Sequence, residues 1–190
     1  MVADVATAAA FTDAWSRLGG PRFELARSER IYRLDTVRAP AHLSGSMRTA
    51  TEDDFDLALE WLQAFATDTG EPTNSDPAGS ARRFIPARPG TRALMLWEVD
   101  GQPVSMAGYT GPTPHGMRIS AVYTPPNLRK RGYASACVAT LSQHLLDEGR
   151  QFCFLFTDLA NPTSNHIYQQ IGYEPVCDVS NCRVPPGAVE

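Results

Sequence analysis

Residues 129–132 are three cations followed by a glycine, Arg129, Lys130, Arg131 and Gly132, at a point where a helix-like pattern begins. The first turn of a helix leaves about four backbone N–H groups without partners, and the helix dipole places roughly half a positive charge there. Glycine has no Cβ, so a bulky ligand can approach the backbone closely. This arrangement suits a phosphate or a pyrophosphate. An ordinary basic turn before a surface helix is the alternative.

The segments on either side of this turn predict how it is held. Residues 117, 119, 121 and 123 alternate with 118, 120, 122 and 124, as on a strand of period two. Pro125 and Pro126 end the strand, because proline has no N–H for a ladder. After Gly132, apolar side chains recur at helical spacing and form one stripe: Ala134, Cys137, Val138, Leu141 and Leu145. The sequence therefore predicts a strand, a tight turn and a long helix.

Two segments resemble the GNAT superfamily of N-acetyltransferases. Residues 129–134, RKRGYA, fit the pyrophosphate loop of that family, (Q/R)-x-x-G-x-(G/A), at every specified position. Residues 161–173 resemble its N-x-x-S-x-x-x-Y-x-x-x-G-(F/Y) segment, and residues 122–126 resemble the end of its central strand. The resemblance covers residues 47–184. It implies an α/β fold with a mixed, mostly antiparallel central sheet, flanking helices and a splayed central strand pair.

The resemblance also implies a cosubstrate, acetyl-coenzyme A, and a set of residues that bind it. The pantetheine arm would pair with the backbone of Val122 and Thr124 as an added strand would, with the Val122 N–H facing the thioester oxygen. Tyr168 would donate a proton to the departing thiolate, a task that suits a phenol of pKa near 10. Packing of the ring is the alternative for Tyr168, and helix capping is the structural role expected of Asn161. The cofactor-binding residues are Val122, Thr124, Arg129, Lys130, Arg131, Gly132, Tyr133, Ala134, Asn161 and Ser164.

No general base stands out in the sequence. A glutamate on the central strand is frequent in the family, but this strand has Arg118 and Ser120. Glu98, His115 and Asp158 are candidates by approximate location alone. Deprotonation of the amine through ordered water is an equal alternative.

The predicted function is transfer of acetyl from acetyl-coenzyme A to a primary amine, by direct attack in a ternary complex. Trp61, Phe65 and Phe84 are candidates for the acceptor pocket, unless they are core residues. A non-catalytic acyl-coenzyme A-binding module of the same fold is the alternative, which the missing base favours and Tyr168 opposes. The sequence leaves the amine open among small metabolites, aminoglycoside-like antibiotics, polyamines and protein N-termini.

Composition excludes several other classes of protein. The chain has 190 residues, enough for one domain with an added arm. Seventeen basic and 21 acidic residues give a net charge of −4, so no general affinity for nucleic acid is expected. No apolar run is long enough to span a bilayer, and the N-terminus lacks the basic segment of a signal peptide. The four cysteines show no zinc spacing. We therefore predict a reduced, cytoplasmic protein that binds no metal.

Periodicity and turn residues predict the other elements. The continuous apolar run 151–157 is typical of a strand covered on both faces. A linker is expected at 39–45, a polar loop at 71–79 and a frayed tail at 185–187. The predicted strands are 28–37, 46–50, 93–99, 103–108, 117–124, 151–157 and 174–184 (strand or hairpin), and the predicted helices are 8–18, 51–70, 80–85, 132–146 and 161–171.

The first 45 residues form an arm in this interpretation, and residues 46–190 form the acetyltransferase domain. The arm resembles the middle of longer two-part GNAT proteins, which would make this chain the C-terminal, active half. Phe11, Trp15 and Leu18 lie on one side of the predicted arm helix. An isolated helix of this length is marginal in water, so the arm is predicted to pack against a second subunit in a homodimer. Packing on its own domain is the alternative.

Overall fold

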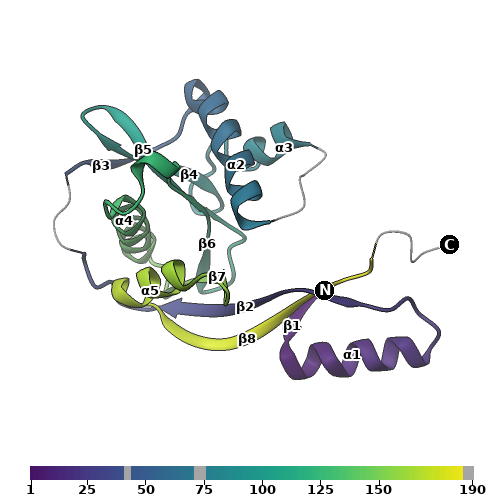
Figure 1. Cartoon of the computed structure of the whole chain (residues 1–190). Helices are drawn as coiled ribbons and strands as arrows, with labels where there is room; N and C mark the ends of the chain where they lie inside the picture. The colour runs from purple at the N-terminus through teal and green to yellow at the C-terminus, as the bar shows by residue number, and fades with distance from the viewer. Residues whose placement is uncertain (41–43, 71–75, 186–190) are drawn as a thin grey trace.

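The computed structural model describes residues 1–40, 44–70 and 76–185. Its strands form one eight-stranded sheet in the order β1-β8-β2-β7-β6-β5-β4-β3 (Figure 1). Neighbouring strands are antiparallel, except for the parallel pair β6 and β7 at the centre. The mixed, mostly antiparallel sheet is therefore confirmed. The strands are β1 Val2–Asp4, β2 Glu24–Leu34, β3 Ser46–Thr49, β4 Ala93–Val99, β5 Gln102–Thr110, β6 Gly116–Tyr123, β7 Phe152–Asp158 and β8 Glu174–Arg183.

Helices cover both faces of this sheet, with α4 and α5 on one side and α2 and α3 on the other (Figure 1). Each side has its own apolar core. The predicted helix stripe faces the first core, where Cys137, Val138, Leu141 and Leu145 are buried. The helices are α1 Val5–Arg17, α2 Phe55–Thr69, α3 Pro77–Arg82, α4 Tyr133–Asp147 and α5 Pro162–Ile171.

Two helices begin three residues earlier than predicted, because aspartates cap them. The carboxylate of Asp4 accepts the N–H of Thr7 at 3.0 Å, and that of Asp76 accepts the N–H of Gly79 at 2.7 Å. Each bond satisfies one of the orphan donors in a first helical turn. The periodicity of apolar residues does not report such caps. The predicted linker, polar loop and tail lie partly outside the described residues.

The central strand β6 does not keep a single alternation. Met117 and Ile119 face the core under α4, whereas Ala121 and Tyr123 face the core under α2. At Ala121, φ is +50°, and the one β5 residue between Met106 and Gly108 stands opposite two residues of β6, 121 and 122. An extra residue is a β-bulge, and it turns the following side chains to the other face. The prediction that these four residues share one face is therefore wrong beyond Ile119.

A slot opens between the two parallel strands. β6 pairs with β7 only from Gly116 to Arg118, opposite Phe152 to Phe154. Beyond that point, residues 119–123 and 155–158 form no ladder with each other. Unpaired groups on a strand edge can take up another extended chain. The predicted splayed central strand pair is therefore confirmed. We call the gap between residues 119–123 of β6 and residues 155–158 of β7 the slot.

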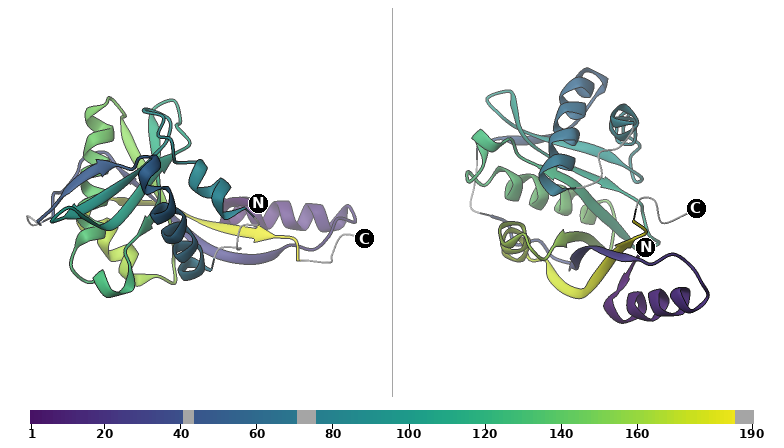
Figure 2. Two further views of the ribbon diagram at one scale, coloured as in Figure 1. Left: turned by 90° about the horizontal axis from the view of Figure 1, so that it is seen from above. Right: turned by 45° about the vertical axis from the view of Figure 1, so that its right-hand side comes forward.

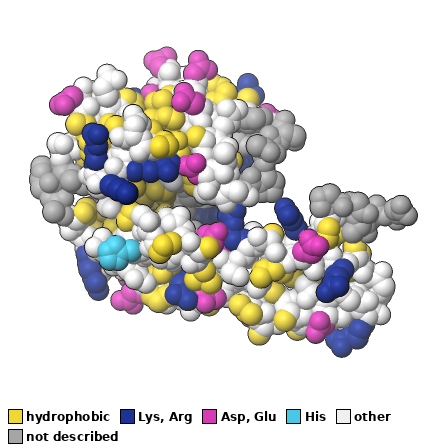
Figure 3. Space-filling view, in the orientation of Figure 1, with side chains coloured by type: hydrophobic (Ala, Val, Ile, Leu, Met, Phe, Trp, Pro, Cys, Tyr) yellow, Lys and Arg dark blue, Asp and Glu magenta, His cyan; other side chains and the backbone are white. Residues whose placement is uncertain are grey.

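The predicted arm divides into two parts in the structure. β2 lies inside the sheet between β7 and β8, while β1 pairs with the far end of β8 and α1 projects beside it (Figure 2). Hydrophobic side chains lie on the surface of this projecting part (Figure 3, lower right). Among the described residues, six of the nine exposed large hydrophobics lie there, Met1, Val2, Val5, Phe11, Trp15 and Leu18, and a seventh, Leu25, lies at the start of β2. The division of the chain at residue 45 stays a prediction.

Candidate functional site

The loop before α4 presents backbone donors to solvent. Lys130 and Gly132 both have left-handed backbones, with φ of +61° and +81°. In the described structure, the backbone N–H groups of residues 130–135 donate no hydrogen bond. Gly132 caps α4 without a side-chain bond, and the first turn of α4 holds no acidic residue. Successive N–H groups in alternating conformations form a concave nest that binds anions, so this loop can hold a pyrophosphate.

The three cations of the loop have different surroundings. Lys130 and Arg131 are exposed beside the free N–H groups. Arg129 is engaged elsewhere, because its Nε donates to the Thr124 carbonyl at 2.9 Å and its Nη2 forms an ion pair with Asp68 of α2. In this structure Arg129 therefore links the loop to Thr124, at the end of β6, and to Asp68 of α2. Its predicted contact with the cofactor would require release from Asp68.

Val122 borders the slot, and Thr124 follows the end of β6. Val122 follows the bulge on the unpaired part of β6 and packs against the core under α4. The hydroxyl groups of Thr124 and Ser105 are hydrogen-bonded at 2.8 Å. The Ser105 hydroxyl also donates to the Tyr123 carbonyl at 3.0 Å. These bonds hold the end of β6 to β5 and keep it away from β7. The position of Val122 is compatible with the backbone contact that the resemblance implies.

Tyr168 of α5 is buried beside the slot. It shares one core cluster with Val122 of β6 and Leu155 of β7, and burial raises its pKa to about 12. Its hydroxyl forms no hydrogen bond within the described chain. Among the described residues, two side-chain atoms are both fully enclosed and unpaired, Arg92 Nε and Ser120 Oγ, and the Tyr168 hydroxyl is not one of them. The hydroxyl is therefore not fully enclosed and has no partner in the described chain, as a proton donor to a bound ligand requires.

The N-terminus of α5 is fixed by amide side chains. The Asn161 carbonyl oxygen accepts the N–H of Ser164 at 3.0 Å, so the expected helix-capping role of Asn161 is confirmed. The Asn165 amide donates to the Asp158 carbonyl at 2.9 Å, and the buried Tyr32 hydroxyl donates to Asn165 at 3.1 Å. These bonds anchor α5 to the end of β7. A cofactor contact of Asn161 and Ser164 stays a prediction.

The three candidate bases lie in different parts of the molecule. Glu98 of β4 accepts a 2.7 Å hydrogen bond from Arg48, which also pairs with Asp54, and it stands in the outer half of the sheet. Asp158 ends β7 beside the slot, where it accepts the N–H of Ala160 at 2.8 Å. Asp158 is therefore the one candidate of the three that borders the slot.

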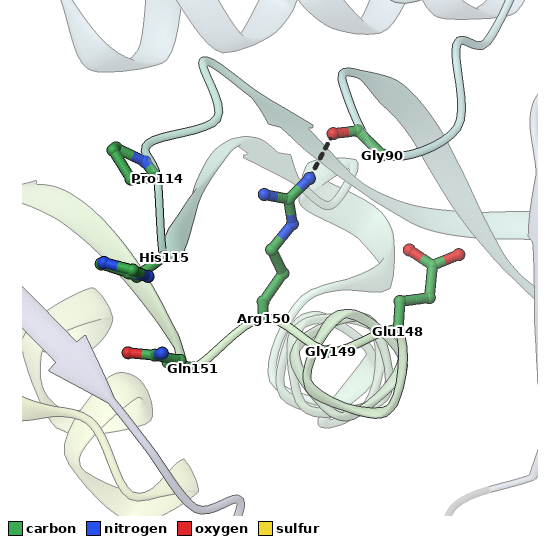
Figure 4. Close-up of a pocket in the computed structure, with 7 residues that line it drawn as sticks. All are labelled: Gly90, Pro114, His115, Glu148, Gly149, Arg150 and Gln151. Carbon is green, nitrogen blue, oxygen red and sulfur yellow. Dashed lines mark hydrogen bonds between the residues drawn. The ribbon is translucent and has the colours of Figure 1, made fainter.

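His115 lies at the opposite end of β6 from the loop. It lines a pocket of about 450 Å³ together with Glu148 and Arg150, which follow the end of α4 (Figure 4). Arg150 closes one side by donating to the Gly90 carbonyl at 2.6 Å. Helix α4 separates this pocket from the loop. It has 15 residues and is therefore about 22 Å long. The paired residues Gly116–Arg118 also stand between His115 and the slot, so His115 does not border the slot.

The aromatic residues predicted for the acceptor pocket belong to the second core. Trp61 and Phe84 are 6% and 9% exposed, and Phe65 packs against the same cluster. The Trp61 ring lies 6.0 Å from that of Tyr123, and a Cβ on Gly108 would stand 2.6 Å from the ring of Phe84. The core alternative is therefore confirmed for Trp61 and Phe84.

Sequence reasoning missed an open face on β7. Cys153, Leu155 and Thr157 are buried, but Phe154 and Phe156 on the other face are only partly buried. The prediction that this strand is covered on both faces is therefore wrong for one face, because α2 and α3 pack over β4, β5 and β6 instead. Hydrophobicity alone could not reveal this, since phenylalanine suits a core and a binding surface equally.

The sequence matches a family model described as the acetyltransferase (GNAT) family over residues 56–173. A comparison with curated proteins finds no match. Among solved structures, a GCN5-related N-acetyltransferase from Kribbella flavida superposes with a TM-score of 0.68 at 19% identity, over 93% of this chain and 65% of that chain. This chain therefore spans less than two thirds of the length of the Kribbella protein.

Two shorter structures have similar folds over 70% of this chain. One is a predicted acetyltransferase with acetyl-CoA from Clostridium acetobutylicum, with a TM-score of 0.58, 17% identity and 91% of that chain covered. The other is AAC(6′)-Iy in complex with the bisubstrate analogue CoA-S-monomethyl-acetylneamine, with a TM-score of 0.55, 16% identity and 92% of that chain covered. Identities this low show the fold alone. The family match, however, covers more than half of the chain and includes the loop, the slot and Tyr168, so the chain belongs to the acetyltransferase (GNAT) family.

Proposed function

We propose that this protein is an N-acetyltransferase that uses acetyl-coenzyme A and acetylates a primary amine by direct attack in a ternary complex. The observation that carries the proposal is the row of free backbone donors at residues 130–135, at the head of the slot between β6 and β7. A pyrophosphate on the loop would direct the pantetheine arm into this slot. The neighbours crystallised with acetyl-CoA and with a coenzyme A analogue support the choice of cosubstrate.

The proposed reaction divides its tasks between backbone and side chains. The unpaired edge of β6 would hold the pantetheine arm as an added strand, and the Val122 N–H would stabilise the thioester oxygen as it becomes negative. The neutral amine attacks the carbonyl carbon, so a C–N bond forms and the C–S bond breaks. The amine gives up a proton to water, directly or through Asp158. Tyr168 donates a proton to the departing sulfur and regains one from solvent.

A non-catalytic acyl-coenzyme A-binding module remains the second candidate. It is favoured by the position of the candidate bases, since Glu98 and His115 stand away from the slot and Asp158 is already hydrogen-bonded. Such a module would bind acetyl-coenzyme A and release no thiol with any amine. The cytoplasmic location and the homodimer stay predictions from the sequence.

Calorimetry with acetyl-coenzyme A, followed by thiol release with a library of amines, tests the proposal. Gly132→Glu should raise the Kd by on the order of tenfold or more, because it places a carboxylate where the loop would hold an anion. Gly101→Glu is the matched control, since Gly101 has a similar φ of +73° in a hairpin with open space around it. Equal Kd values for the wild type and Gly132→Glu would remove the loop from the site.

A further inference from the structure

The face of β7 that points away from α4 and α5 carries a row of phenylalanines. The rings of Phe152, Phe154 and Phe156 follow one another at centroid distances of 6.3 and 6.4 Å. All three side chains are partly buried, and none belongs to either core cluster. We call Phe154 and Phe156 the phenylalanine strip, because these two stand where the slot opens.

An exposed guanidinium lies over this strip. Arg118 of β6 stands opposite Phe154, and its Cζ is 4.8 Å from the centroid of the Phe156 ring. Arg118 is exposed and forms no ion pair or hydrogen bond with the described chain. By contrast, the Cζ of Arg33 lies 4.2 Å from the centroid of the Phe152 ring, but the Arg33 guanidinium forms a 2.8 Å ion pair with the Asp35 carboxylate. The donors of Arg118 are therefore free for a ligand.

A buried hydroxyl without a partner completes the group. Ser120 follows Arg118 on the same face of β6, and its Oγ is enclosed and forms no hydrogen bond with the described chain. It stands opposite Gly108, whose missing Cβ leaves room for the Phe84 ring. Buried hydroxyls are nearly always paired, so an orphan at this position indicates a partner that is absent from the protein itself.

These groups lie next along β6 from the place where the thioester would be held, since Ser120 is two residues from Val122. The slot begins just beyond Arg118 and Phe154. A pantetheine arm that enters from the loop at 130–135 runs along β6 toward this point. The core under α4 and α5 fills one face of the sheet here. The acceptor must therefore approach from the face that carries Arg118, Ser120 and the phenylalanine strip.

Resting on the proposed function, we propose that the acceptor is an amine that also carries a carboxylate and an apolar body, as an apolar amino acid does. The carboxylate binds the Arg118 guanidinium, whose planar donors match a carboxylate in two parallel hydrogen bonds. The apolar body packs on the phenylalanine strip, and the amino group donates to Ser120 Oγ. A polycationic acceptor is disfavoured, because its charges would meet the uncompensated guanidinium.

Matched amines test the proposal. The probes are L-phenylalanine against phenethylamine, L-leucine against 3-methylbutylamine, and 4-aminobutyrate against butylamine, each with acetyl-coenzyme A, while spermidine represents polycations. We expect the wild type to favour at least one carboxylate member over its partner in kcat/KM by about ten- to hundredfold, the scale of a charge-assisted hydrogen bond. In Arg118→Gln this ratio should fall toward one, and Arg118→Lys should retain part of it. Arg33→Gln is the control and should leave the ratio unchanged.

The outcomes separate this inference from the function on which it rests. A protein that fails to bind acetyl-coenzyme A, or releases no thiol with any probe, would overturn both. A protein that acetylates spermidine or the plain amines as well as the carboxylated ones would overturn only the assignment of the acceptor. Retention of the carboxylate preference in Arg118→Gln, with normal acetyl-coenzyme A binding, would also refute the role of Arg118.

Discussion

Replacement of Tyr168 by phenylalanine removes a single oxygen atom and separates a catalytic role from a packing role. The Tyr168 hydroxyl makes no hydrogen bond within the described chain, so its loss leaves no buried group unpaired. We therefore expect the free energy of unfolding to change by less than about 0.5 kcal/mol. Acetyl-coenzyme A affinity should be retained, while kcat should fall about a hundredfold, the usual effect of one general acid.

Tyr173 provides the matched control. Its ring packs against that of Tyr168 at a centroid distance of 5.8 Å, and its hydroxyl is bonded to that of Ser142 at 2.8 Å in the core. Tyr173→Phe leaves the Ser142 hydroxyl buried without a partner, which should lower the free energy of unfolding by about 1–3 kcal/mol. Its kcat should stay unchanged. The two variants should therefore show opposite patterns of stability and rate.

The pH dependence adds a further check. Burial raises the pKa of Tyr168 to about 12, above the value near 10 of an unfolded chain. The neutral phenol therefore stabilises the fold fully below pH 10, and this contribution is lost as the pH rises toward 12. Between about pH 6 and 9 the phenol stays protonated, so the ratio of wild-type to Tyr168→Phe rates should be constant.

Single-turnover assays with acetyl-coenzyme A bound in advance measure the chemical step directly. An unchanged single-turnover rate constant in Tyr168→Phe would refute the role of proton donor. A loss of stability as large as that in Tyr173→Phe would indicate that the Tyr168 hydroxyl has a structural partner. Either result would leave packing as the function of this residue.

Two further predictions concern the loop and the arm. Asp68→Asn should free Arg129 from its half-exposed ion pair and tighten acetyl-coenzyme A binding by about two- to fivefold. Calorimetry measures this, and an unchanged or weaker affinity would mean that Arg129 does not reach the cofactor. Phe11→Ser combined with Trp15→Gln should convert a homodimer to a monomer in light scattering, because these residues expose apolar surface on α1. A wild-type protein that is already monomeric would contradict the homodimer.

Much of the fold could be predicted from the sequence, because local patterns govern it. The apolar stripe of α4, the glycine that begins it and the strand that precedes the loop are contiguous in the chain. The loop depends on backbone N–H groups and on one glycine, so residues 129–134 are sufficient to indicate it. Tyr168 and the cap at Asn161 are likewise fixed by spacing within one short helix.

Other features depend on contacts between distant segments. Alternation identifies β2 as a strand but not its place between β7 and β8, since each strand could pair with many others. The bulge at Ala121 depends on the register between β5 and β6. The pairing of Arg129 with Asp68 of α2 is likewise absent from the motif that contains Arg129.

The sequence by itself determined the family, the anion-binding loop and the candidate proton donor, because a short stretch of backbone and one helix contain their chemistry. Only the tertiary structure decided which side chains meet at the open face of the slot. Arg118 and Ser120 lie on β6 and Phe156 on β7, and a long helix separates these strands in the chain. They converge because the two strands pair in parallel for three residues and then part. No local pattern contains that register, and the acceptor side could therefore not be predicted from the sequence.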